Sequence, residues 1–157
     1  MENTQNTTAT TVAYKDATPE EQAARRAAQE KRDLAFLASR GLSKNASIDR
    51  GYLSAAVIKD DHMVAKNGKI GHRYFFALYN ADGNNGKGET KRFGFVTFSP
   101  KMMKLFDGIV DYKTQAKKDH NTSIVATIFS GVNANGYRDV AWANLSVNHK
   151  QIKFDLN

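Results

Sequence analysis

Residues 72–98 read HRYFFALYNADGNNGKGETKRFGFVTF, and this stretch decides the fold. Its two ends, 72–80 and 92–98, are rich in the aromatic and β-branched residues that favour strands. The segment between them, 81–91, is rich in glycine and asparagine, which favour turns. The stretch therefore predicts two strands joined by a long loop.

A helix is expected directly after this hairpin. Ser99 can cap its first turn, and Pro100 suits the first helical position. Apolar residues then follow helical spacing, namely Met102, Met103, Leu105, Phe106, Ile109, Val110 and Tyr112.

Three further strand patterns flank this unit. Residues 51–65 come before the hairpin, whereas residues 122–132 and 137–147 come after the helix and share the turn 133–136. Three strands, one helix and two strands predict an all-β fold, a five-stranded oligonucleotide-binding (OB-fold) barrel with its helix between the third and fourth strands. A mixed sheet with one helix is the alternative. A short run at 151–156 closes the chain.

The N-terminal part has a different texture. Residues 1–17 lack apolar periodicity and are expected to form a disordered arm. Thr18 can cap a following helix, and Gly41 is placed to end it. We therefore divide the chain into an arm (1–17), a helix and linker (18–45) and an OB-fold domain (46–157). The helix is expected to be a loosely attached appendage, and docking on a partner subunit is the alternative.

Composition limits the classes of protein. The chain has 157 residues, which suits one domain, and no cysteine, which excludes disulfides and thiolate chemistry. It has no apolar run of about 18 residues and no secretory signal pattern, so we expect a soluble cytoplasmic protein without membrane contact.

The net charge of +7 is unevenly distributed. Residues 1–49 are balanced, whereas residues 50–157 hold 16 basic and 9 acidic side chains and thus the whole excess. A basic folded domain favours polyanionic partners such as nucleic acid, although many basic domains are merely soluble.

The pattern over residues 50–154 resembles the bacterial and phage single-stranded DNA-binding protein family, in a diverged phage or plasmid form. The likeness lies in the two strands and basic loop of RYFFALYNADGNNGKGETKRFGFVTFSPKMMKLF and in the closing hairpin SIVATIFSGVNANGYRDVAWANLSV. It implies sequence-independent binding of single-stranded DNA in replication or recombination, by a homodimer or homotetramer. Family members typically end in a long tail with an acidic tip, a pattern that Phe154 to Asn157 do not match.

Binding of a single strand needs cations for its phosphates and flat rings for its bases. Alternate residues of a strand share a face, so Arg73, Phe75 and Tyr79 lie opposite Tyr74 and Phe76. Because an unpaired charge is costly inside a barrel, we expect the Arg73 set to face outward.

The same rule places Arg92 outside together with Phe98, and sends Phe93 and Phe95 into the core. A bulge near Gly94 would reverse this register. The resemblance also favours Phe98, since the family often stacks a base near the end of this strand.

The basic loop and the only tryptophan complete the candidate site. The loop lysines are expected to contact phosphates, or else to belong to a merely solvated hairpin, and core packing and stacking both stay open for the tryptophan. The predicted nucleic-acid-binding residues are Arg73, Phe75, Tyr79, Lys87, Lys91, Arg92, Phe98 and Trp142. A stacking platform has no dedicated contact to the 2′-hydroxyl, so single-stranded RNA stays open as a ligand besides DNA.

Catalysis and cofactors are not expected. The histidines at 62, 72, 120 and 149 lack metal-ligand spacing, and no phosphate-binding GxxxxGK[ST] motif is present. Asp60-Asp61-His62 could begin a metal-dependent nuclease site, but no matching acidic partners are evident. We predict no enzyme, no cofactor and no metal. A second hypothesis uses the barrel as a protein-interaction or inhibitory factor, with the N-terminal helix as its contact.

Overall fold

The computed structural model describes residues 17–116 and 122–157. The elements in chain order are α1 (Pro19–Ser39), β1 (Lys44–Val64), β2 (Ile70–Asn80), β3 (Glu89–Thr97), α2 (Pro100–Ala116), β4 (Ile124–Val132), β5 (Arg138–Val147) and β6 (Lys150–Ile152). Both predicted helices and all five predicted strands are present. Of the 17 residues expected to form an arm, residues 1–16 lie outside the part described, and Ala17 begins it.

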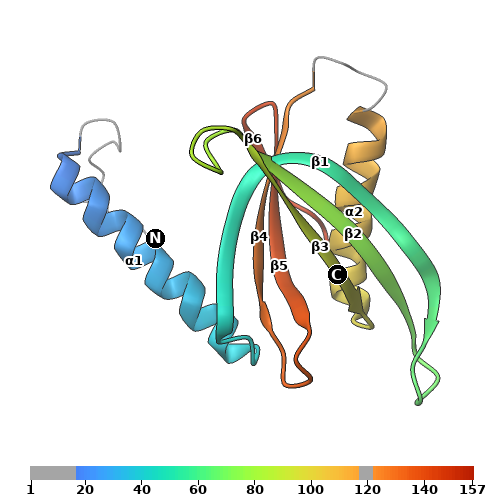
Figure 1. The fold of residues 1–157 in the computed structure, drawn as a ribbon. Helices are drawn as coiled ribbons and strands as arrows, with labels where there is room; N and C mark the ends of the chain where they lie inside the picture. The colour runs from blue at the N-terminus through green and yellow to red at the C-terminus, as the bar shows by residue number, and fades with distance from the viewer. Residues whose placement is uncertain (1–16, 117–121) are drawn as a thin grey trace.

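The strands form one antiparallel sheet in the order β3-β2-β1-β4-β5-β6 (Figure 1). The sheet is open, with β3 and β6 at its edges, so the expected closed barrel of five strands is not confirmed. The sixth strand arises because Lys150 to Ile152 turn back and pair with the end of β5. The fold is therefore mostly β, with six strands and two helices.

β1 connects the two halves of the sheet. Its first part, from Lys44 to Tyr52, pairs with β4, and its second part, from Tyr52 to Val64, pairs with β2. The expected strand began only at Gly51, because residues 44–50 show no strong strand pattern and are held by their pairing with β4. Three irregularities in the β1–β2 pairing bend the second part, as bulges do.

The core is built from interlocking rings. Tyr74 and Phe95 stack with their centroids 5.3 Å apart, and Phe106 of α2 meets Phe95 edge-on at 4.9 Å. Phe76 makes edge contacts with both Phe95 and Phe106. The four side chains expected to face inward, Tyr74, Phe76, Phe93 and Phe95, are all buried, which confirms that half of the face assignment.

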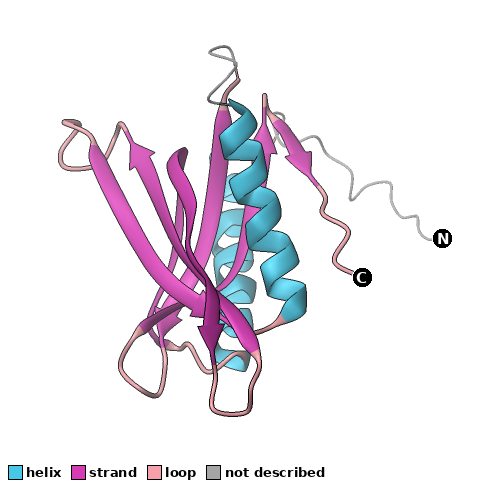
Figure 2. Ribbon diagram, turned by 90° about the vertical axis from the view of Figure 1, so that its right-hand side faces the viewer, coloured by secondary structure: helices cyan, strands magenta, loops and turns pink. Residues whose placement is uncertain are grey.

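α2 packs along the strands (Figure 2). It buries Leu105, Phe106 and Ile109. The Ser99 hydroxyl accepts a hydrogen bond from the Met102 backbone N–H at 3.3 Å, as predicted for a cap. The ring of Phe154, near the end of the chain, lies against Gly108 of α2. A side chain at position 108 would overlap this ring.

A polar contact within the core also joins α2 to β2. The Tyr74 hydroxyl donates a hydrogen bond of 2.7 Å to Asp107, and His72 Nδ1 lies 3.1 Å from the same carboxylate oxygen. Burial of Tyr74, together with this hydrogen bond, raises the pKa of its hydroxyl far above the ordinary value, so it stays a donor.

α1 begins at the predicted cap, where Thr18 and Glu21 form a reciprocal capping box. It ends at Ser39 with Arg40 as its C-cap, and Gly41 follows with φ +75, as expected for a helix terminator. Figure 1 shows the helix leaning away from the sheet and meeting it only at its C-terminal end. None of the described helices is long and apolar enough to cross a membrane.

α1 packs against the sheet through a second, smaller apolar cluster. Leu37 and Leu42 bury themselves against Phe129 on the face of β4 opposite the main core. Gly131 lets Leu42 approach the β4 backbone, because a Cβ there would overlap the Leu42 carbonyl. The helix is thus an appendage attached through its last turn.

Phe75 and Phe76 are neighbours with opposite expected effects on stability. Phe76→Ala removes a fully buried ring and should lower the free energy of unfolding by about 3–5 kcal/mol. Phe75→Ala removes a half-buried ring on the other face and should cost clearly less. Urea unfolding of both variants measures the difference, and equal losses would contradict the face assignment.

Candidate nucleic-acid interface

The outward side chains of β2 and β3 form one surface, which we call the β2–β3 platform. Its β2 members are Arg73, Phe75, Tyr79 and the buried Ala77, and directly opposite Arg73, Phe75, Ala77 and Tyr79 on β3 lie Val96, Gly94, Arg92 and Thr90. The pairing of the two strands runs without irregularity, so the bulge considered near Gly94 is absent and the register is not reversed. The platform therefore combines two rings with two arginines.

Both arginines of the platform are exposed, as the sequence predicts. Arg73 lies two residues before Phe75 on β2, and Arg92 pairs with Ala77, two residues after it. Because alternate residues share a face, the two arginines stand on the same face as Phe75, one on each side of its position along the strands. Cations on both sides of a ring are the arrangement that a phosphate backbone with stacked bases requires.

Phe75 is half-buried and has open space beside it. Its partner on β3 is Gly94, and a Cβ built there would meet no atom within 4 Å. The Lys59 Nζ lies 5.8 Å from the centre of the Phe75 ring, which adds a third cation to this position. The glycine thus leaves the area next to the ring uncovered.

Tyr79 and Phe98 lie at the two ends of the platform, and each contacts a glycine. The Tyr79 hydroxyl lies against Gly88 of the β2–β3 loop, and the ring remains 39% exposed. The Phe98 ring covers Gly71, where any side chain would overlap it, and is half-buried. Phe98 therefore also supports the start of β2, so removing its ring would affect folding as well as stacking.

The two lysines of the loop differ in their surroundings. Lys87 is exposed in a loop of tight turns, in which Asn84, Asn85 and Gly86 have positive φ. Lys91 lies opposite Leu78 on the core-facing side, and its Nζ is 2.9 Å from a carboxylate oxygen of Asp49. Lys87 is therefore exposed in the loop that joins β2 to β3, whereas Lys91 forms an ion pair with Asp49 that the sequence did not indicate.

Trp142 is not brought to the platform. It lies on β5, which is separated from β2 in the sheet by β4 and β1. Its ring packs against both apolar clusters, and its Nε1 donates a hydrogen bond of 2.9 Å to Asn144. Its role in stacking stays a prediction.

A cavity that the sequence did not indicate lies beside the platform. It has a volume of about 440 Å³ and is bounded by Arg73 and Gly94 on one side and by Tyr137, Arg138 and Asp139 on the other. Tyr137 is 73% exposed, whereas Arg138 is held by hydrogen bonds to Ser130 and to the Asn45 carbonyl. These residues are far from β3 in the sequence, so their proximity to it could not be predicted. The one signal in the sequence is Tyr137, an aromatic residue directly after the turn glycine Gly136.

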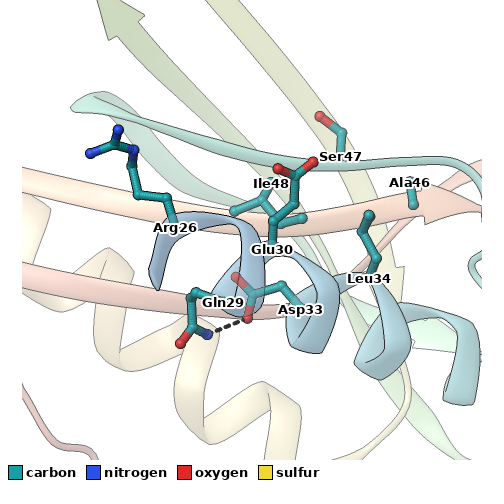
Figure 3. A pocket seen from close by; sticks show the side chains of 8 residues that line it. All are labelled: Arg26, Gln29, Glu30, Asp33, Leu34, Ala46, Ser47 and Ile48. Atoms are coloured by element: carbon teal, nitrogen blue, oxygen red, sulfur yellow. Dashed lines mark hydrogen bonds between the residues drawn. The ribbon is translucent and has the colours of Figure 1, made fainter. Parts of the chain in front are cut away.

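A cavity of about 520 Å³ separates α1 from β1 (Figure 3). Glu30 and Asp33 line it from the helix, and Asp33 accepts a hydrogen bond of 2.8 Å from Gln29. Leu34 and Ile48 add apolar surface on the two sides. Among the described residues of the lining, Arg26 is the one cation against the two carboxylates, so the excess of negative charge makes the cavity a poor site for nucleic acid.

The groups weighed for catalysis do not assemble in the described part of the chain. Asp60, Asp61 and His62 hydrogen-bond to one another in the second part of β1, and the Asp61–His62 hydrogen bond lowers the pKa of Asp61 and raises that of His62. No group of three or more His, Asp or Glu among the residues described could hold a metal ion. His120 lies outside the described residues.

Comparison of the chain with protein-family models, with curated proteins and with solved structures finds no match.

The burial of Asp139 beside the cavity at Tyr137 can be tested by the pH dependence of stability. Burial raises the pKa of its carboxyl, partly opposed by a hydrogen bond from the Val140 N–H. A raised pKa in the folded state means that stability falls as the pH rises from about 4 through that value. Asp139→Asn keeps the acceptor without the charge, so it should be more stable than the wild type at pH 7.

This gain should shrink as the pH approaches 4, where the wild-type carboxyl becomes neutral. Urea unfolding at pH 4, 5.5 and 7 measures it, with the exposed Asp82→Asn as control. A stability difference between Asp139→Asn and the wild type that does not change with pH would contradict the raised pKa of Asp139.

Proposed function

We propose that this chain binds single-stranded nucleic acid, DNA in the first place, without sequence preference and on the β2–β3 platform. The observation that carries the proposal is the arrangement of Phe75 beside open space, between Arg73 and Arg92. Rings stack on bases of any kind, and arginines neutralise phosphates without reading sequence.

We further propose that the sheet is an opened form of the OB-fold, which is itself a partly open barrel. Two features support this: the helix α2 lies between the third and fourth strands, and β3 and β5 line the same cavity without hydrogen-bonded pairing. In that fold, ligands bind on the face of the second and third strands and on the loops beside it. The β2–β3 platform corresponds to that face.

The direct test is the affinity for labelled oligothymidine, measured by fluorescence anisotropy. Phe75→Ala should weaken binding by about 1–3 kcal/mol, because one stacking ring is lost. Tyr112→Ala, which removes another exposed ring on α2, is the matched control and should leave affinity unchanged. A wild-type chain that binds no oligonucleotide would reject the proposal and favour a protein-interaction role for α1.

The charge contribution is tested by salt. If Arg73, Arg92 and Lys87 each neutralise one phosphate, the logarithm of affinity should fall with the logarithm of salt with a slope of about −2, at about −0.7 per contact. Arg92→Ala should make the slope shallower by about 0.7.

Lys91→Ala is the informative comparison, because its neighbour Arg92 faces the platform and its own ammonium pairs with Asp49. We expect a smaller change of slope for Lys91→Ala than for Arg92→Ala. An affinity independent of salt would contradict the electrostatic part of the proposal.

A further inference from the structure

Tyr52 lies at the position of β1 that pairs with two neighbouring strands. It is where β1 passes from pairing with β4 to pairing with β2, since its partners are Val125 on one side and Tyr79 on the other. Its side chain is 55% exposed. Directly opposite residues on adjacent strands lie on the same face with their Cβ atoms about 4.5–5.5 Å apart. Tyr52 therefore continues the aromatic surface of the platform by one strand beyond Tyr79.

The backbone allows the two tyrosines to come this close because Gly51 precedes Tyr52. A Cβ at Gly51 would lie 3.1 Å from the carbonyl carbon of Tyr79 and closer still to its oxygen. Any other residue would push β1 and β2 apart at this point. The juxtaposition of Tyr52 and Tyr79 is thus built into the strand crossing.

A cavity of about 490 Å³ opens next to Tyr52, within the range typical of ligand sites. Its lining joins the exposed Arg50 and the amide of Asn80 to the apolar side chain of Val125. Asn80 accepts a hydrogen bond from the Asp82 N–H at 2.9 Å through its oxygen, so its nitrogen remains the end that can donate. Asp82 also lines this cavity and contributes its one carboxylate. A ring, a guanidinium and an amide donor at one cavity suit a nucleotide.

We propose that the single strand continues past Tyr79 onto β1, where one base stacks on Tyr52 and an adjoining phosphate contacts Arg50. The inference rests on the proposed function, since the ligand is the same strand. Phe75 and Tyr79 lie four residues apart on β2, or about 14 Å at 3.4 Å per residue. A dinucleotide held at Phe75 is too short to span this distance, whereas a longer strand reaches Tyr52.

The experiment compares oligothymidines of 2, 8, 12 and 16 nucleotides by anisotropy on the wild type, Tyr52→Ala and Tyr52→Phe. Tyr52→Ala should bind the shortest strand as the wild type does and the longest about 5- to 150-fold more weakly, the loss of one stacked base. Tyr52→Phe keeps the ring and should match the wild type at every length. Arg50→Ala should reduce the salt slope for the longest strand only.

Each result has one meaning. Equal affinity of Tyr52→Ala and the wild type at every length would overturn the inference and leave the platform intact. A uniform loss at all lengths, with an unchanged thermal melt, would also overturn it, because Tyr52 would then belong to the central site. A wild type that binds no strand would reject the proposed function and this inference with it, a result distinct from the other two.

Discussion

The packing of Tyr74 and Phe76 against Phe95 and Phe106 is the constraint on which the rest of the structure depends. These rings are buried within 4.9 to 6.0 Å of one another and come from β2, β3 and α2. Side chains alternate along a strand, so a slip of one residue in β2 would expose this cluster and bury Arg73 instead. The core therefore determines which side chains face solvent. The proposed binding surface consists of the alternate residues of the same two strands, β2 and β3.

Glycines give this surface its shape. Gly94 leaves space beside Phe75, Gly71 receives the Phe98 ring, and Gly51 brings the crossing strand up to Tyr79. In each case the missing side chain lets a ring be approached or supported. The platform is thus defined as much by where side chains are absent as by the aromatic and basic residues themselves.

The helix α1 stands apart from this arrangement. Its attachment through Leu37, Leu42 and Phe129 lies on the face of β4 opposite the main core, in a cluster of its own. The capping box at Thr18 and Glu21 stabilises its first turn locally. Most of the helix therefore depends on local interactions, and its charge is balanced, which separates it from the basic sheet in both packing and electrostatics.

The sequence by itself determined the local features: five of the six strands, both helix caps, and the inward and outward faces of β2 and β3. These follow from side-chain alternation, capping chemistry and the cost of burying a charge, all of which act between residues close in the chain. Tertiary structure alone decided the open sheet, the Lys91–Asp49 ion pair, the cavity at Tyr137 and the pairing of Tyr52 with Tyr79. Each of these joins residues far apart in sequence, and their contact depends on how β1 bends between β2 and β4, which no local pattern encodes.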